Sequence, residues 1–249
     1  LVQLNQKSKL RRTEDVFLAE GVKMFLEAPR EQLQEVYVSE SFLEKCSCRE
    51  HLEEVGYEVV SDSVFSKISD TCTPQGVLCV LKQFHYNIEE MLRDKAPLFL
   101  LLENIQDPGN LGTMLRTGEG AGVSGIIMSR DTVDLYNPKV IRSTMGSIYR
   151  VPFYYADDFA AAVHQVQRAG VSVYAAHLRG KNSYACQDYT KGTAFLIGNE
   201  GNGLREETAE LADCYIRIPM EGKVESLNAA VASSILMYEA HRQRATIEK

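Results

Sequence analysis

Residues 97–112 of the chain are PLFLLLENIQDPGNLG. The run Leu98–Leu102 is continuously apolar, which is typical of a strand buried on both faces of a parallel sheet. A turn that contains aspartate, proline and glycine, residues 107–112, follows the run and opens a helix that we expect to reach about Gly120. A buried strand that leads directly into a helix is the repeating unit of α/β proteins.

The same alternation continues toward the C-terminus. We predict further strands at 125–128, 149–152, 172–176, 193–198 and 214–218, and further helices at 138–145, 157–169, 205–211 and 227–243. This pattern predicts a parallel sheet with helices on both faces. Ligands of such sheets bind in the loops at the carboxyl ends of the strands.

The N-terminal part predicts a smaller α/β unit. Its strands are expected at 16–20, 35–39, 57–60 and 75–81, and its helices at 22–28, 41–55 and 63–69. A polar and charged segment, residues 84–97, separates this unit from the apolar run that follows. We place the domain boundary there, which gives domains 1–95 and 96–249.

Composition excludes several classes of protein. The chain of 249 residues has 27 basic and 34 acidic side chains, a net charge of −7 and 45% hydrophobic residues, which match a globular protein rather than a fibrous or disordered one. Its longest apolar runs, such as 97–102, fall far short of the ~20 residues that span a membrane. A secretory signal is not recognisable, although a first residue other than Met leaves a trimmed start open. The acidic balance, taken alone, argues against a nucleic-acid partner.

The cysteines and histidines show no metal-binding pattern. Six cysteines are scattered without a C-x-x-C pair, and the five histidines lack the spacing of paired ligands, whereas a zinc site needs clustered thiolate or imidazole groups. We therefore expect no metal, reduced thiols and a cytoplasmic location.

Three loops that contain glycine follow apolar strands. In the first, helical spacing places Leu111, Met114 and Leu115 on one face, so Arg116 can point away from the core. The second, residues 197–203, has the spacing G-x-x-G-x-G, which is not a dinucleotide fingerprint but permits close approach of a ligand to the backbone. In the third, residues 216–232, Ser226 is a candidate N-cap of the last helix. Each loop by itself is also explained without function, as a surface arginine, a surface carboxylate or a helix cap.

Together, in this order and at this spacing, the three loops resemble the motifs of the SpoU/TrmH family of RNA 2'-O-ribose methyltransferases, which belongs to the SPOUT superfamily. The first motif, N-x-G-x-x-x-R, is matched by Asn110, Gly112 and Arg116, and the second, G-x-E-x-x-G, by Gly198, Glu200 and Gly203. The third motif is I-P-M followed by S-L-N-x-[AS]. It is matched by Ile218, Pro219, Met220, Ser226, Leu227, Asn228 and Ala229. The resemblance covers about residues 97 to 244, and the first 95 residues are similar to the family's small RNA substrate-binding domain.

The resemblance implies an α/β domain with a deep trefoil knot, an exception to the rule that chains are unknotted, and S-adenosylmethionine (AdoMet) as methyl donor. The implied donor-binding residues are Leu196, Gly198, Gly201, Ile218, Met220, Ser226, Leu227 and Asn228. The implied catalytic residues are Arg116, Asn110, Glu200, Ser226 and Asn228. The family assigns Arg116 to activating the ribose hydroxyl; because an arginine is effectively always protonated, stabilisation of the developing alkoxide is at least as good an explanation. Glu200 is expected to hold Arg116 or a neighbouring group, and Ser226 and Asn228 to hold the ribose or the donor.

The resemblance also implies an RNA partner and a homodimer. For RNA we name Arg11, Arg12, Arg116 and Arg142, within a basic face around Arg116 and Arg142 that could also include Lys7, Lys9, Lys139 and Arg150. Such a local face is compatible with a negative net charge. The small residues of the helix 227–243 are a candidate dimer contact. Ribosomal RNA (rRNA) is the first choice of substrate, with a guanosine possible, and transfer RNA (tRNA) the alternative; a silent RNA-binding homologue and a nucleotide-cofactor enzyme are the rival classes. We expect no membrane or DNA partner.

Overall fold

The structure is a computed structural model that describes residues 1–247. The chain forms two compact units: residues 1–84 and 134–149 make the first, and the rest of the described chain makes the second. Residues 134–149 thus fold with the first unit, although they lie within the predicted domain 96–249. The boundary at 95/96 stays a prediction.

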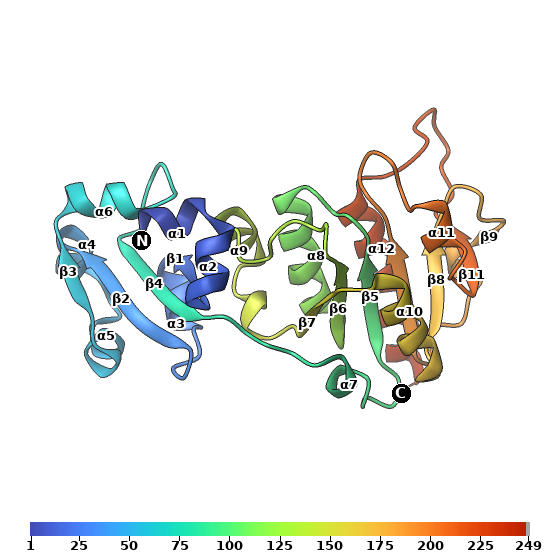
Figure 1. The fold of residues 1–249 in the computed structure, drawn as a ribbon, viewed down its shortest axis with the longest axis horizontal. Helices are drawn as coiled ribbons and strands as arrows, with labels where there is room; N and C mark the ends of the chain where they lie inside the picture. The colour runs from blue at the N-terminus through green and yellow to red at the C-terminus, as the bar shows by residue number, and fades with distance from the viewer. Residues whose placement is uncertain (248–249) are drawn as a thin grey trace. The chain divides into compact units, whose positions relative to one another are not determined.

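The first unit contains a mixed sheet of four strands in the order β1-β4-β2-β3 (Figure 1). Its strands are β1 (Val16–Glu20), β2 (Leu33–Ser39), β3 (Glu58–Val60) and β4 (Val77–Lys82). β4 pairs antiparallel with β1 and β2, and β2 pairs parallel with β3. Its helices are α1 (Val2–Gln6), α2 (Ser8–Glu14), α3 (Val22–Leu26), α4 (Glu40–Lys45), α5 (Arg49–Val55), α6 (Asp62–Ile68) and α9 (Pro138–Thr144), followed by the 3-10 turn η1 (Ser147–Tyr149).

The predicted helix 41–55 is wrong, because two helices occupy this range. Cys46, the C-cap of α4, has the extended torsions φ −70° and ψ 137°, and α5 begins only at Arg49. The intervening Cys-Ser-Cys triplet consists of residues with low helix propensity.

The second unit contains seven strands in the order β7-β6-β5-β10-β8-β11-β9, and every pairing is parallel. The strands are β5 (Leu98–Leu102), β6 (Gly125–Ser129), β7 (Phe153–Ala156), β8 (Ser172–Ala176), β9 (Asn182–Ser183), β10 (Thr193–Ile197) and β11 (Cys214–Arg217). The helices are α7 (Ile88–Met91), α8 (Pro108–Ala121), α10 (Phe159–Arg168), α11 (Glu206–Ala209) and α12 (Ala229–Ile247), with the 3-10 turn η2 (Tyr184–Cys186). The predicted parallel α/β sheet is confirmed. No helix among residues 1–247 is long and apolar enough to cross a membrane.

The predicted strand 149–152 is also wrong. Residues 147–149 form the turn η1, and the strand begins one residue after Pro152, at Phe153, which pairs with Ile126. Proline has no N–H to donate, so it commonly precedes a strand rather than occupying its middle. Only the carbonyl of Pro152 joins the ladder, where it accepts from Ile126 N at 3.0 Å.

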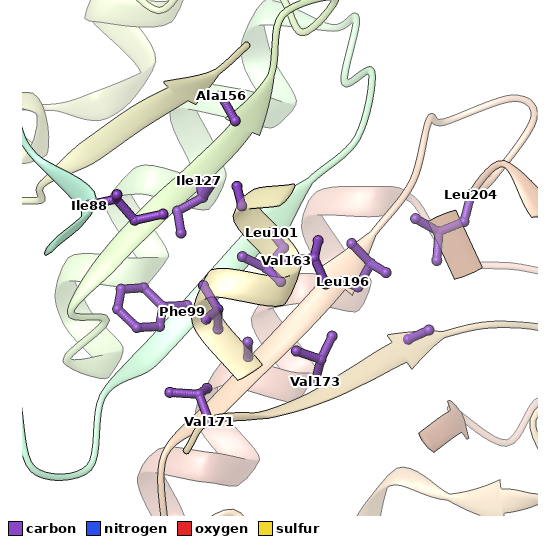
Figure 2. Close-up of a cluster of buried hydrophobic side chains, with 14 of the residues drawn as sticks. Ile88, Phe99, Leu101, Ile127, Ala156, Val163, Val171, Val173, Leu196 and Leu204 are labelled. Carbon is purple, nitrogen blue, oxygen red and sulfur yellow. The ribbon is translucent and has the colours of Figure 1, made fainter. Parts of the chain in front are cut away.

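Both faces of the seven-stranded sheet are covered. On one face, alternate residues of the strands pack under α10, including Phe99, Leu101, Val173 and Leu196 (Figure 2). α8 and α12 pack against each other, with Met237 next to Gly118. Because successive strand residues point to opposite faces, Leu196 belongs to the α10 side and its neighbour Ile197 to the other.

Candidate active site

The first motif loop ends in the capped start of α8. Asp107 accepts a hydrogen bond from Asn110 N at 2.8 Å, and Pro108 occupies the first helical position, as expected for a helix N-terminus. Leu111, Met114 and Leu115 are buried, as the helical spacing predicts. Arg116 is exposed, and no ion pair or hydrogen bond to another described residue engages its guanidinium. It is therefore free for a ligand.

Glu200 holds this loop from the second motif. Its carboxylate accepts hydrogen bonds from Gln106 N at 3.1 Å, Asp107 N at 3.0 Å and Asn110 Nδ2 at 2.9 Å. Partial burial raises the pKa of Glu200, but the bonds from Asn110 and the two backbone amides outweigh burial and leave the pKa below its usual value. Of the two expected partners of Glu200, Arg116 or a neighbouring group, the structure shows the neighbour, Asn110.

The third motif joins through Asn228. Its Nδ2 donates to Asn110 Oδ1 at 2.9 Å, and its Oδ1 accepts from Ala230 N at 2.9 Å and Val231 N at 3.3 Å. Asn228, and not Ser226, therefore caps α12, which begins at Ala229 rather than 227. Glu200, Asn110 and Asn228 form a continuous chain of hydrogen bonds across all three loops, which we call the amide bridge.

The second motif loop folds back on itself after β10. Asn199 and Gly203 exchange backbone hydrogen bonds of 3.0 and 2.9 Å. A Cβ on Gly198 would overlap backbone atoms of Gly203 and Leu204, so only glycine fits this position. Glycine here serves the close approach of two backbone segments.

The buried carboxylate of Glu103 binds residues that follow this loop. Glu103, 1% exposed at the end of β5, accepts from Arg205 N at 2.8 Å, from the Arg205 guanidinium at 3.3 Å and from the Thr208 hydroxyl. Arg205 also pairs with Asp131. Sequence analysis did not single out these residues; the one available signal was a charged residue directly after a buried strand.

A cavity of about 270 Å³ lies at the carboxyl ends of β10, β8 and β11, which are neighbours in the sheet. Six of the predicted donor-binding residues line it: Gly198, Gly201, Ile218, Met220, Ser226 and Leu227. Leu196 does not line it, because its side chain belongs to the cluster under α10 and is 0% exposed. Asn228 lines an adjacent hollow instead, together with Asn110, Glu200 and Gly201.

Sequence analysis missed part of the cavity wall. His177 and Leu178 enter from the turn after β8, and Arg217 and Glu225 flank the third motif. The turn after β8 carries no motif, and its place between the other two loops depends on the strand order β10-β8-β11.

The cavity suits a methyl donor with an apolar purine and charged groups. Its walls are aliphatic at Ile197, Ile216, Ile218 and Leu227, and charged at Glu200, Arg217 and Glu225. Apolar walls with a few polar groups are typical of cofactor sites, and carboxylates favour a positively charged ligand such as a sulfonium or an ammonium. The residues present therefore fit AdoMet.

The predicted RNA-contacting residues of the first unit differ in their availability. Arg11 is 3% exposed, donates to the carbonyls of Leu4 and Asn5 and pairs with Asp134. This burial does not fit a contact with RNA. Arg12 is exposed, and Arg142 pairs with Asp70 at 2.7 Å. In the second unit Arg150 pairs with Glu119.

Comparison with known proteins identifies the family of the chain. Residues 97–238 match the SpoU rRNA methylase family, and residues 1–79 match an MRM3-like substrate-binding domain. A 23S rRNA (guanosine(2553)-2'-O)-methyltransferase, RlmP of Bacillus subtilis, is 35% identical over 72% of this chain and 70% of its own. The 23S rRNA (guanosine-2'-O-)-methyltransferase RlmB of Bordetella pertussis is 32% identical over 86% of this chain and 91% of its own.

Solved structures agree as well. The SpoU methyltransferase AviRb of Streptomyces viridochromogenes in complex with AdoMet superposes with a TM-score of 0.89, at 26% identity, over 98% of this chain and 96% of that one. An AdoMet-bound rRNA methyltransferase of Sinorhizobium meliloti has a TM-score of 0.83 at 32% identity, over 97% of this chain and 92% of that one.

Fold, cavity and motifs thus define an AdoMet-dependent RNA 2'-O-ribose methyltransferase with an N-terminal substrate-binding domain. The chain belongs to the SpoU rRNA methylase family, and this membership implies the trefoil knot. The resemblance, fold class, activity and donor predicted from sequence are confirmed.

Proposed function

We propose that the enzyme methylates the 2'-hydroxyl of a guanosine in 23S-type rRNA, in the cytoplasm. The two relatives named above act on guanosine of 23S rRNA. The likeness to the rRNA methyltransferase of Sinorhizobium meliloti extends over 97% of the chain, whereas a TrmH/SpoU tRNA-modifying enzyme of A. aeolicus matches 65% of it, with a TM-score of 0.57. The presence of the substrate-binding domain therefore favours rRNA over the alternative, tRNA.

The roles that we assign to the site residues depend on one observation, which is that the amide bridge lies beside the cavity. Gly198, Gly201, Ile218, Met220, Ser226 and Leu227 would hold AdoMet, which supplies a methyl group on a sulfonium. The amide bridge fixes the start of α8, and with it Arg116, relative to this cavity. Methyl transfer needs the acceptor oxygen in line with the methyl carbon, so such positioning contributes much of the rate.

Arg116 would act on the acceptor oxygen. Its unpaired guanidinium either stabilises the developing alkoxide or, helped by an RNA phosphate, assists removal of the proton. Arg12 and Arg142 of the first unit would bind phosphates, together with the exposed Lys7 and Lys9. Arg11 is left out of this surface because its guanidinium is buried.

We also propose a homodimer. The small residues Ala229, Ala230 and Ser233 of α12 are buried within the chain, where α12 packs on α8. The same helix exposes Val231 (48%) and Tyr238 (49%), about two turns apart. We propose this face of α12, rather than the small residues, as the dimer contact, because the small residues are already buried within the chain and a partner would cover Val231 and Tyr238.

The assignment is tested by methylation of unmodified 23S rRNA and tRNA with labelled AdoMet, followed by mass spectrometry of the nucleosides. We expect 2'-O-methylguanosine in rRNA, and a loss of at least about 100-fold in rate for Arg116→Ala. Arg168→Ala, which removes an exposed arginine at the end of α10, is the matched control. The proposal would be contradicted if the methyl group were found on a base, or if only tRNA were methylated. It would also be contradicted if Arg116→Ala methylated RNA at the wild-type rate.

A further inference from the structure

His177 is a wall residue of the donor cavity that none of the three motifs contains. It follows β8 directly and lies in the turn 177–180. Its backbone N donates to Ile216 O at 3.0 Å, and its carbonyl accepts from Gly180 N at 2.9 Å. A Cβ on Gly180 would come within 2.8 Å of the Ile216 backbone, so this turn is tightly seated on β11.

The ring of His177 is held in one tautomer. Arg179 donates its backbone N–H to His177 Nδ1 at 3.1 Å, which requires an unprotonated Nδ1 and places the ring proton on Nε2. Burial, and then the positive charge of Arg179, lower the pKa of His177 below its usual value, against a smaller opposing effect of Glu206. The ring is therefore neutral near pH 7, and no other hydrogen bond to a described residue engages it.

We propose that His177 is a donor-binding residue whose neutral ring offers Nε2–H to an acceptor atom of AdoMet, and that a positive charge on this ring selectively disfavours the cationic donor. The inference rests on the donor cavity proposed above. His177 lies outside the family motifs, and its protonation would make the charge preference of the cavity depend on pH.

The chemistry of donor and product makes the selectivity measurable. AdoMet carries a positively charged sulfonium, whereas the product S-adenosylhomocysteine (AdoHcy) carries a neutral thioether in its place. Protonation of Nδ1 ends the bond from Arg179 and adds a positive charge to the cavity wall. Repulsion then acts on the sulfonium and not on the thioether.

Other charged and titratable groups surround the ring. They are Arg179 in the same turn, Glu206 of α11, Tyr215 of β11 with its ring centroid 5.1 Å away, and Glu200, Arg217 and Glu225 in the cavity wall. The pKa values of Glu200 and Glu206 are lowered, so these two carboxylates stay ionised at mildly acidic pH. A variant that removes only the histidine leaves all six groups in place and isolates its contribution.

The experiment is calorimetric titration of the full chain with AdoMet and with AdoHcy, from about pH 7.5 down to about pH 5. The variants are His177→Asn and His177→Gln, which keep an amide donor but do not titrate, and His164→Asn, which removes an exposed histidine of α10. Melting temperatures at each pH establish that every variant is folded.

When the pH is lowered from about 7.5 to about 5, we expect the affinity of the wild type for AdoMet to decrease about fivefold more than its affinity for AdoHcy. This difference should disappear in both His177 variants and persist in His164→Asn. An equal pH dependence for the two ligands in the wild type, or a difference that survives in the His177 variants, would overturn the role of His177. Failure of the wild type to bind AdoHcy at pH 7.5 would instead overturn the cavity itself, and the inference with it.

Discussion

The carboxamide of Asn110, in the first motif, forms hydrogen bonds to residues of the second and third motifs. Its Nδ2 donates to Glu200 and its Oδ1 accepts from Asn228. A carboxamide can do both because it has a donor and an acceptor at its two ends. An aspartate at this position would lose the donor and face the carboxylate of Glu200, which is like-charged. Asparagine is therefore required by the hydrogen bonding itself.

Replacing Asn110 with alanine should slow methyl transfer more than it weakens donor binding. The start of α8 would lose its ties to Glu200 and Asn228, and misplacement of Arg116 by about 1 Å can cost roughly 100-fold in rate. Single-turnover kinetics and calorimetric AdoMet binding measure the two effects separately. Asn182→Ala, which removes an exposed amide of β9 outside the cavity wall, serves as control. A loss confined to donor affinity would contradict the positioning role of Asn110.

Arg11 and Arg12 are adjacent, yet the structure gives them opposite surroundings. Arg11→Ala should destabilise the first unit by ~2 kcal/mol, because Asp134 and two carbonyls lose a charged donor. Arg12→Ala should change stability by less than about 0.5 kcal/mol but weaken binding to RNA. Hydrogen exchange of the peptides around 1–14 and 134–149 measures the first effect, and RNA titration at fixed salt the second. Equal stability of the two variants would disprove the buried role of Arg11.

At the scale of elements, the loop after β10 depends on a close approach of two backbone segments. Gly198→Ala should destabilise the second unit by ~2–4 kcal/mol, because a methyl group would overlap the backbone of Gly203 and Leu204. Gly201→Ala in the same loop has its nearest neighbour, Asn199 Oδ1, at 3.6 Å and should leave the melting temperature nearly unchanged. Thermal unfolding of the two variants makes the comparison. Similar melting temperatures would show that the loop yields to the methyl group.

At the scale of the whole molecule, the exposed face of α12 is expected to hold the dimer together. Val231→Glu should shift the protein toward monomer, because it would bury a charge at the proposed interface. Val64→Glu, on α6 of the first unit, replaces a valine of similar exposure, 43% against 48%, and should leave the dimer intact. Size-exclusion chromatography with light scattering distinguishes the two results. A monomeric wild type, or a Val231→Glu dimer, would exclude this face.

Local patterns predicted most of the second unit. The apolar run Leu98–Leu102, the capped helix after it and the glycine loop 198–203 all lie where they were expected. The prediction was less successful where one interaction overrides a pattern. β7 begins only after Pro152, and the triplet Cys46–Cys48 separates two helices where one was expected. Asn228, rather than Ser226, is the N-cap of α12.

The sequence by itself determined the chemistry of this protein, because motif residues at fixed spacing fold into local turns and helix starts that place Arg116 outward and Asn110, Glu200 and Asn228 at loop ends. Only the tertiary structure decided which of two adjacent apolar residues, Leu196 or Ile197, faces the cavity, since both fit a buried strand. It alone also decided that His177 lines the cavity. That placement follows from the strand order β10-β8-β11, which joins residues distant in sequence and leaves no local signal.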